Sequence, residues 1–319
     1  MFLLIKPTSR CNFNCNFCSA KNLQIKHYDK VPEIIKDRIK VLDPDWIIIT
    51  GGDPLMVSPK YYEELLSITK CQISLTTNLK DFYLNPDKWV DLFKNPRIAI
   101  CTSFQYGTGR LWDKNTPYTE DQFKKVMFLF KEKVGYMPNF ISVITKENED
   151  RALDHLYLAK ELNTQCRLNG VFSFGASNEY YPRYKMVDLW LKIKELNLEQ
   201  YYIDNNFFSE GTCNLNTNLL CTSTIRACWV KQDTTLEYGT CEDLLIEGYS
   251  KIPLDKNRPI PKVQDIPYNE LINDKCLSCE LYRFCNACKI NRIMAKSCPN
   301  YCEKMLKRKE KILKSGWKI

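Results

Sequence analysis

Strand-like and helix-like segments alternate along the first 200 residues, and this alternation constrains the fold more than any other feature of the sequence. The strand-like runs are short, apolar and rich in β-branched residues, whereas the segments between them carry apolar residues at helical spacing. The expected strands span residues 2–6, 46–50, 72–77, 97–103, 139–145 and 167–174. The expected helices span residues 32–42, 86–94, 119–134, 149–162 and 187–196, and a further helix opens at Ser58-Pro59.

Repeated β-α units predict an α/β fold with parallel strands, right-handed crossovers and helices on the outside. A closed barrel of eight such units takes about 250 residues. The sixth unit of this chain ends near residue 198. We therefore expect a partial (β/α)6, TIM-like barrel over residues 1–200, whose carboxyl strand ends line a reaction site. Residues 201–319, where the alternation stops, form a second, cysteine-rich domain in this interpretation.

Three cysteines, Cys11, Cys15 and Cys18, follow the first expected strand at the spacing C-x3-C-x2-C. Three thiolates can hold a four-iron cluster and leave one iron open to a small chelating molecule. A zinc knuckle that adds His27 as the fourth ligand is an alternative, and chance is another in a chain with sixteen cysteines. Disulfides are not expected, because the apolar run Met1–Ile5 is too short for a secretory signal.

A second motif, Gly51-Gly52-Asp53-Pro54, ends the second expected strand. Together with the cysteine triad and the aromatic Phe17, it resembles the radical S-adenosylmethionine (SAM) superfamily, whose usual motif is Gly-Gly-Glu-Pro. Asp53 departs from that motif. The resemblance implies a [4Fe-4S] cluster chelated by the amino and carboxylate groups of SAM. It also implies cleavage of SAM to a 5′-deoxyadenosyl radical that abstracts hydrogen from a substrate.

The resemblance also implies contacts with SAM. Phe17 would pack near the adenine, and Gly51, Gly52, Asp53 and Pro54 would meet the methionine amine. Three polar residues at strand ends would complete the site: Asn78 after the third strand, Ser103 at the ribose and Asn148 at the adenine. For these last three, the alternative is a strand-end residue that satisfies local backbone groups.

A second group of cysteines begins after residue 201 and includes Cys276-x2-Cys279-x5-Cys285-x2-Cys288. Two Cys-x2-Cys pairs are a strong metal signature, which zinc ribbons also use. Beside a radical SAM core it resembles the SPASM extension, although the last gap is one residue shorter than usual. The first implied auxiliary [4Fe-4S] cluster takes Cys221, Cys228, Cys241 and Cys288. The second takes Cys276, Cys279, Cys285 and either Cys298 or Cys302.

Full ligation of both auxiliary clusters would leave no open iron, which favours electron transfer or a structural role. A single-cluster extension and a zinc module remain alternatives. Cys213, in Gly211-Thr-Cys-Asn214 at the expected junction between the domains, has no ligand role in this scheme. In some relatives a thiol delivers a hydrogen atom to a substrate radical, and Cys213 is the candidate for that role here.

The charge and composition exclude several classes. No run of eighteen apolar residues occurs and no secretory signal stands out, so we expect a cytoplasmic protein with no membrane partner. The net charge is +8, and residues 289–319 hold the excess, with ten Lys/Arg against two Glu. Residues 304–314 read as a basic helix with Met305, Leu306, Ile312 and Leu313 partly buried, more typical of a solvated face than of a nucleic-acid or acidic-peptide site.

The favoured function is an oxidoreductase that modifies a peptide or protein by crosslinking, dehydrogenation or epimerisation, as SPASM-type relatives do. The triad begins at residue 11, so we expect no N-terminal leader-binding domain. A separate leader-binding protein, or direct recognition of a short substrate, would take its place. A flavodoxin- or ferredoxin-type donor would supply electrons. The alternatives are SAM-radical oxidation of a sugar, a cyclitol or another small molecule, and a metal-binding nucleic-acid module.

Overall fold

A sheet with the strand order β6-β5-β4-β3-β2-β1-β7-β8-β9 runs through the protein. The computed structural model describes residues 2–22, 27–171, 176–203, 227–231, 236–239, 252–253, 278–279, 281 and 300–315. The strands are β1 (Phe2–Lys6), β2 (Trp46–Ile49), β3 (Gln72–Thr76), β4 (Ile98–Ser103), β5 (Asn139–Ile144), β6 (Cys166–Gly170), β7 (Ala227–Lys231), β8 (Leu236–Gly239) and β9 (Ile252–Pro253). The helices are α1 (Glu33–Leu42), α2 (Pro59–Ile68), α3 (Lys80–Leu84), α4 (Val90–Phe93), α5 (Glu120–Val134), α6 (Asp154–Glu161), α7 (Arg183–Glu195), α12 (Tyr301–Leu306) and α13 (Lys309–Lys314).

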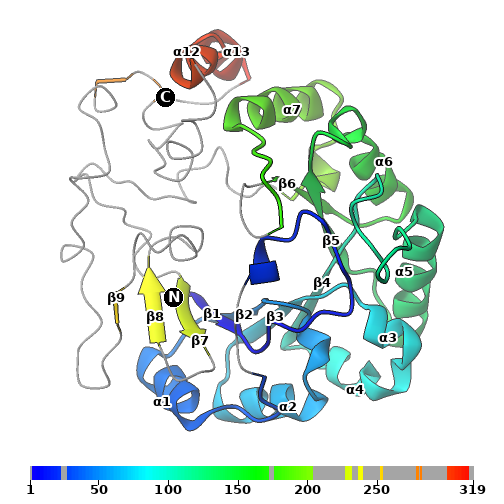
Figure 1. Ribbon diagram of the computed structural model, residues 1–319, viewed down its shortest axis with the longest axis vertical. Helices are drawn as coiled ribbons and strands as arrows, with labels where there is room; N and C mark the ends of the chain where they lie inside the picture. The colour runs from blue at the N-terminus through cyan, green and yellow to red at the C-terminus, as the bar shows by residue number, and fades with distance from the viewer. Residues whose placement is uncertain are drawn as a thin grey trace.

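Strands β1 to β6 are parallel, and each pairs with the next strand along the chain. Helices α1 to α7 follow an arc outside these strands (Figure 1). This open, six-stranded parallel sheet with helices outside confirms the expected α/β architecture, and it is consistent with a partial barrel. The arrangement places the carboxyl ends of all six strands along one edge.

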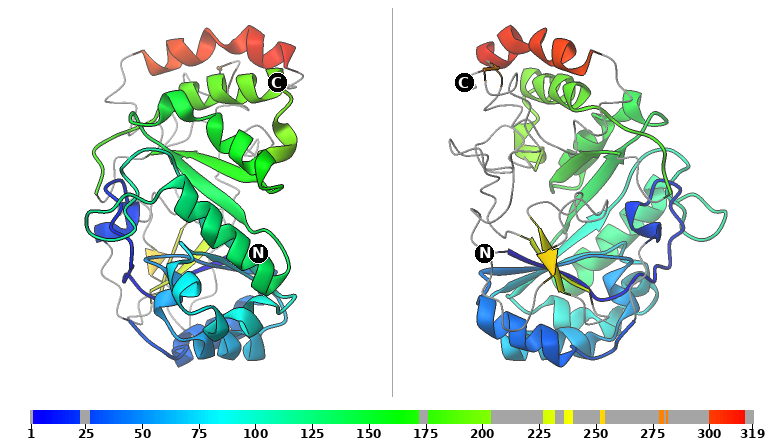
Figure 2. Two further views of the ribbon diagram at one scale, coloured as in Figure 1. Left: turned by 90° about the vertical axis from the view of Figure 1, so that its right-hand side faces the viewer. Right: turned by 60° about the vertical axis from the view of Figure 1, so that its left-hand side comes forward.

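The strands bury alternate residues, because helices cover only one face of the sheet (Figure 2). On β2 and β3 the residues Ile47, Ile49, Ile73 and Leu75 are fully buried, while their neighbours along each strand are partly exposed. The core therefore lies between the sheet and the helix layer, and the other face of the strands is left for a site.

Two predicted helix starts are confirmed at the level of hydrogen bonds. Ser58 caps α2, and its hydroxyl accepts from the Lys60 amide. Thr119 caps α5 in a capping box with Gln122, and Gly135 ends that helix in the left-handed region with φ 105°.

The helix expected over residues 86–94 is wrong in detail. An unpredicted helix, α3, precedes this segment and ends at Asn85. A 3₁₀ turn (Pro86–Lys88) and the short α4 follow. The break has a local cause, since Pro86 has no amide hydrogen with which to continue α3. Likewise, the helix expected over residues 149–162 divides into a 3₁₀ turn (Glu149–Arg151) and α6.

Strand β7 was not predicted and lies beyond the expected domain boundary at residue 200. It pairs parallel with β1, and Cys228 stands opposite Leu3. Strands β8 and β9 then add to the sheet in antiparallel fashion. The sheet therefore continues past the boundary that the composition indicates.

The C-terminal segment forms two helices, α12 and α13, rather than one. Met305 and Ile312 are buried as expected, but Leu306 and Leu313 are about 40% exposed, so that part of the prediction is wrong. Both helices lie against α7 (Figure 2).

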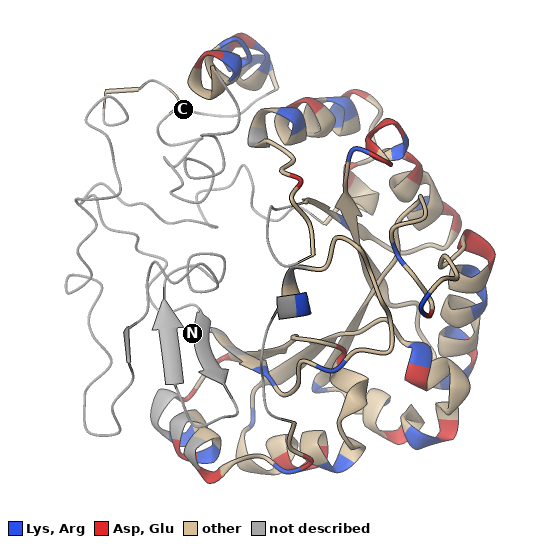
Figure 3. Cartoon of the chain, in the orientation of Figure 1, with Lys and Arg blue, Asp and Glu red and all other residues tan. Residues whose placement is uncertain are grey.

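Charge as well as apolar contact attaches these helices to α7. Arg308 binds the carboxylate of Asp188 through Nε at 2.7 Å and through Nη2 at 2.5 Å. Lys194 donates to the carbonyl of Ser315. Basic and acidic residues are mixed on these helices (Figure 3). The basic tail is thus partly neutralised within the chain. In the described part of the chain, no helix is long and apolar enough to cross a membrane.

Candidate functional site

The cysteine loop, residues 7–22, follows β1 and lies inside the arc of helices (Figure 1). Its first turn is local. The Thr8 hydroxyl accepts from the Arg10 amide at 3.0 Å, and Cys11 Sγ accepts from the Phe13 amide at 3.4 Å. An amide donor aimed at a sulfur favours the thiolate form that a metal requires.

The glycine turn after β2 packs directly on this loop. The Gly52 amide donates to the Thr8 carbonyl at 2.9 Å, and the Asp53 amide donates to the Arg10 carbonyl at 2.7 Å. A Cβ on Gly52 would lie 2.0 Å from the Arg10 oxygen, and one on Gly51 would lie 2.7 Å from the Thr8 oxygen. The two glycines therefore permit a backbone-to-backbone contact that fixes the start of the cysteine loop.

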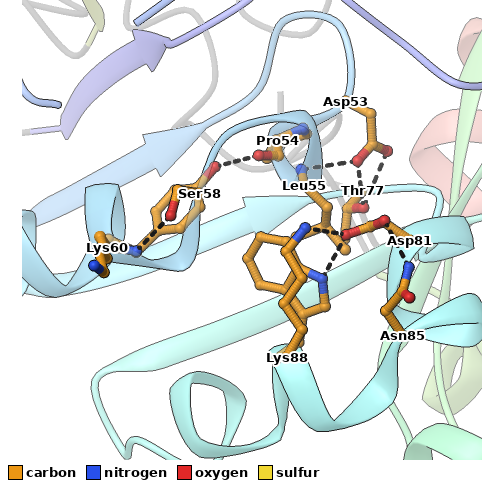
Figure 4. Close-up of polar contacts among 11 residues, drawn as sticks. Asp53, Pro54, Leu55, Ser58, Lys60, Thr77, Asp81, Asn85 and Lys88 are labelled. Atoms are coloured by element: carbon orange, nitrogen blue, oxygen red, sulfur yellow. Dashed lines mark hydrogen bonds and ion pairs between the residues drawn. The ribbon is translucent and has the colours of Figure 1, made fainter. Parts of the chain in front are cut away.

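The Asp53 carboxylate joins the ends of β2 and β3 rather than facing open space (Figure 4). It accepts hydrogen bonds from the Leu55 amide at 2.9 Å, the Thr77 hydroxyl at 2.9 Å and the Asn78 amide at 2.7 Å. The side chain is 2% exposed. Burial raises the pKa of this carboxyl to about 6, and the three donors oppose the rise.

Asn78 extends this network to the cysteines. Its side-chain nitrogen lies 2.7 Å from Asn12 Oδ1 and 3.7 Å from Cys11 Sγ. Beside it, Lys80 Nζ donates to the carbonyls of Asn12 and Trp112. The end of β3 thus holds the same loop that the glycine turn holds from β2.

The segment after β4 supports the loop from a third side. The Asn14 amide donates to the Leu111 carbonyl at 3.2 Å, and the Asn16 amide donates to the Gly109 carbonyl at 3.0 Å. Backbone groups from the end of β2 and from the segment after β4, with side chains from the end of β3, therefore order the cysteine loop.

Arg110 is the residue of this site that sequence reasoning missed. It is 7% exposed, and its Nη1 donates to the Ser103 hydroxyl at 3.0 Å. Its guanidinium lies 5.1 Å from the centroid of the buried Phe17 ring. Burial raises the pKa of the Cys18 thiol, and the charge of Arg110 opposes this rise. No acid bonds to it, and its Nε has no hydrogen-bond partner among the described residues. A buried cation in this state is suited to a carboxylate ligand.

The three cysteines share one electrostatic environment. Burial raises the pKa of Cys11 to about 12, and the charges of Asp53, Cys15 and Cys18 raise it further. Burial is also the main cause of the raised pKa of Cys18. Without metal the raised pKa values keep Cys11 and Cys18 protonated, and a bound cation would reverse this, because coordination deprotonates a thiol. Within the described residues no three or more His, Cys, Asp or Glu side chains already form a metal-binding group.

The zinc alternative needs His27 beside the triad, and the ring is engaged elsewhere. Its Nδ1 lies 3.3 Å from the Thr8 hydroxyl and its Nε2 lies 3.3 Å from the Asp29 carboxylate. The donor set in the described loop is therefore three thiols, which is the chemistry of a four-iron cluster with an open iron.

Buried polar atoms without partners lie on or after β4 and β5. Within the described residues, six such atoms belong to Thr102, Gln105, Arg110, Tyr118 and Thr145. A cavity of about 210 Å³ borders Gln105 and Tyr118 at the start of α5. Thr102 lies on the same buried face of β4 as Ile98 and Ile100, so these atoms do not form one ligand site.

The remaining predicted contacts have structural partners already. Asn148 is fully buried, and its amide bonds to the backbone of Tyr106, Val143 and Thr145. The Pro54 carbonyl accepts from the Tyr62 hydroxyl. Asn148 therefore fills the local backbone role that was the alternative for it, whereas the Ser103 hydroxyl accepts from the Arg110 side chain. The SAM contacts of both residues stay predictions.

Most of the second cysteine group lies outside the described residues. This holds for Cys213, Cys221, Cys241, Cys276, Cys285, Cys288 and Cys298. Of the others, Cys228 lies in β7, Cys279 packs partly buried against the core, and Cys302 is exposed on α12. Their predicted ligand roles stay predictions.

Comparison with known families decides what the cysteine loop belongs to. The family described as the radical SAM superfamily matches residues 5–159. Residues 5–159 are thus similar to a radical SAM domain. The matched region contains the cysteine triad, the glycine turn, Asn78, Ser103, Arg110 and Asn148, and it ends before the second cysteine group begins. No curated protein sequence matches the chain.

Solved structures share the fold of this chain. Native anSMEcpe with bound AdoMet and Cp18Cys peptide is 16% identical with a TM-score of 0.65, over 95% of this chain and 98% of that one. SuiB of Streptococcus suis bound to its precursor peptide SuiA is also 16% identical with a TM-score of 0.64, over 92% of this chain and 72% of that one. At this identity the likeness extends to the fold alone.

Proposed function

We propose that this protein is a radical SAM enzyme, an oxidoreductase that modifies a peptide or protein by crosslinking, dehydrogenation or epimerisation. The observation that carries the proposal is the cysteine loop with its three thiols, which groups from the ends of β2 and β3 and from the segment after β4 hold in place. The likeness over nearly the whole chain to anSMEcpe and SuiB, each in a structure with a bound peptide, supports a peptide substrate.

In this proposal Cys11, Cys15 and Cys18 hold the SAM-binding [4Fe-4S] cluster. Arg110 binds the carboxylate of SAM, because it is the buried cation beside Cys18 that no described acid neutralises. Phe17 packs at the adenine, and Ser103 orients the guanidinium of Arg110. Bound together, the cluster and SAM supply a 5′-deoxyadenosyl radical that abstracts hydrogen. The task of the chain is to orient SAM and to exclude water.

Residues 1–200 form the core and residues 201–319 the cysteine-rich domain with two auxiliary [4Fe-4S] clusters. The parallel pairing of β7 with β1 supports a close connection between the two, since it sets Cys228 opposite Leu3 on the strand that leads into the cysteine loop. In this proposal the cysteines of residues 201–319 would hold clusters able to take up an electron in an oxidative outcome, and Cys213 would donate hydrogen in an epimerisation. The electron donor is a flavodoxin or ferredoxin, and the location is cytoplasmic.

Anaerobic reconstitution tests the proposal in two steps. With SAM and dithionite, the full-length protein should release 5′-deoxyadenosine, and its iron content should approach about twelve per chain, because three four-iron clusters are expected. A short peptide encoded beside the gene should then lose hydrogen atoms in pairs on co-expression, or gain D-residues. Absence of 5′-deoxyadenosine release would contradict the radical reaction. Turnover of a sugar or cyclitol with an unchanged peptide would contradict only the substrate.

A further inference from the structure

The side chain of Asn78 makes a contact that binding of SAM does not explain. Its Nδ2 points at the cysteine loop and lies 3.7 Å from Cys11 Sγ, which is within the range of an N–H···S hydrogen bond. The same nitrogen lies 2.7 Å from Asn12 Oδ1. Both hydrogens of this amide are therefore directed at the loop, one at a thiol and one at an acceptor beside it.

The orientation of the Asn78 amide follows from its other partners. Its Oδ1 accepts from the backbone amide of Lys80 at 2.8 Å, and that amide can only donate. A flipped side chain would face its NH₂ group toward another donor, so the nitrogen must lie on the side of Cys11. Its backbone amide is bound in turn by the buried carboxylate of Asp53 at 2.7 Å, and the residue is 5% exposed.

We propose that Asn78 sets the reduction potential of the cluster bound at Cys11, by donating its side-chain N–H to the Cys11 sulfur. This inference rests on the proposed function, since it needs a cluster at the triad. A donor to a ligating thiolate withdraws electron density from the iron and so stabilises the reduced cluster over the oxidised one. Asp53 acts through Asn78 as a positioning residue, because its carboxylate holds the backbone from which the amide extends.

The expected effect is a lower potential when the donor is lost. One hydrogen bond contributes about 1 kcal/mol, which shifts the ratio of reduced to oxidised cluster about fivefold at a fixed solution potential. For a one-electron couple this is about 40 mV, since a tenfold change is 59 mV. Asn78→Leu removes both functions of the amide. Asn78→Asp keeps an oxygen for the Lys80 amide and replaces the donor with an acceptor, so its potential should fall further.

The experiment is a redox titration of the reconstituted full-length protein, followed by EPR, for the wild type, both Asn78 variants and Asn12→Ala. The cluster in question is recognised by the change in its EPR signal on addition of SAM. Asn12→Ala is the matched control, because it removes the other acceptor of Asn78 and leaves the contact with Cys11. We expect a lower potential in both Asn78 variants and a potential close to that of the wild type in Asn12→Ala.

Three results would overturn the inference. If the Asn78 variants load iron and titrate at the potential of the wild type, the N–H···S contact does not tune the cluster, and the proposed function is untouched. If Asn12→Ala lowers the potential equally, placement of the loop and not the donor is responsible. If the wild type binds no cluster at the triad, the proposed function and this inference fail together. Should Asn78→Leu not fold, Asn78→Asp decides the matter, because it retains the acceptor for Lys80.

Discussion

Substitution of Gly52 by alanine tests the contact on which the cysteine loop depends. A Cβ at this position would lie 2.0 Å from the Arg10 oxygen and 2.6 Å from the Arg10 carbonyl carbon, whereas ordinary contacts are 3.4–4 Å. The neighbouring atoms are backbone, so no side chain can rotate away. The cysteine loop must therefore withdraw by more than about 1 Å, which is a large shift for a packed interior.

That shift breaks two backbone hydrogen bonds, from Gly52 to Thr8 at 2.9 Å and from Asp53 to Arg10 at 2.7 Å. Each contributes about 1 kcal/mol, and the overlap adds about 1–3 kcal/mol. Alanine restores up to about 1 kcal/mol by restricting the unfolded chain. We expect Gly52→Ala to lower the free energy of unfolding of the apoprotein by about 2–4 kcal/mol and to reduce 5′-deoxyadenosine release at least tenfold.

Gly135→Ala is the matched control. This glycine ends α5 at φ 105°, so alanine is strained there by about 1–2 kcal/mol, but no atom lies within 4 Å of the added Cβ. Urea unfolding of both apoproteins, followed by iron analysis and SAM cleavage after reconstitution, separates loss of stability from loss of the site. If Gly52→Ala loads iron and cleaves SAM as Gly135→Ala does, the close approach does not order the loop and the reasoning is refuted.

Three further predictions concern single side chains. Arg110→Met should weaken SAM binding at least tenfold in equilibrium dialysis without loss of iron, because it removes the buried cation assigned to the carboxylate. Burial raises the pKa of Asp53 from 3.8 to about 6, so between these pH values the folded apoprotein holds a proton that the unfolded chain releases. The stabilisation is full below pH 3.8 and is lost progressively as the pH rises through 6. Relative to Asp53→Asn, which cannot titrate, the wild type should lose about 1 kcal/mol of unfolding free energy between pH 5 and pH 7. Cys15→Ala should abolish SAM cleavage, whereas Cys279→Ala should retain unproductive cleavage but form no modified product.

Each of these has an outcome that contradicts it. Unchanged SAM affinity in Arg110→Met would place the carboxylate elsewhere. Parallel pH profiles for wild type and Asp53→Asn would mean that Asp53 titrates alike in the folded and unfolded chains. Identical behaviour of Cys15→Ala and Cys279→Ala would remove the division of labour between the two cysteine groups.

The six parallel strands could be predicted from the sequence because their signal is local. A strand covered by helices on one face needs an apolar run such as Trp46–Ile49 within a few residues, and caps such as Ser58 and Thr119 stand next to the helices they begin. The cysteine triad and the glycine turn could also be recognised from the sequence, because each is a short local motif. The boundaries of α3 and α4 could not be predicted, since they depend on the conformation of Asn85. The spacing of apolar residues does not indicate that conformation.

The roles of Asp53 and Arg110 could not be predicted, because they depend on contacts between distant segments. Asp53 lies 24 residues before Thr77 and bonds to it only when β2 and β3 are neighbours. Arg110 stands in a segment whose apolar residues show no regular spacing. Its guanidinium is buried against Phe17, which lies more than 90 positions earlier in the sequence. Strand β7 was missed for a similar reason, since its pairing with β1 joins residues more than 200 positions apart.

The order of events at the cysteine loop follows from these contacts. Fixing the backbone of one residue costs about 1–2 kcal/mol, so a floating loop would draw its ordering energy from the metal, as a zinc finger does. Here backbone hydrogen bonds order the loop from two sides: the amides of Gly52 and Asp53 donate to it from the end of β2, and its own Asn14 and Asn16 amides donate to the segment after β4. The strands themselves are held by the buried core between the sheet and the helices. None of the three cysteines of the triad is fully buried in that core. The backbone of the cysteine loop is therefore ordered before iron arrives, although the three thiols do not yet form a metal-binding group among the described residues. Cluster assembly would then have to gather the thiols on an ordered loop.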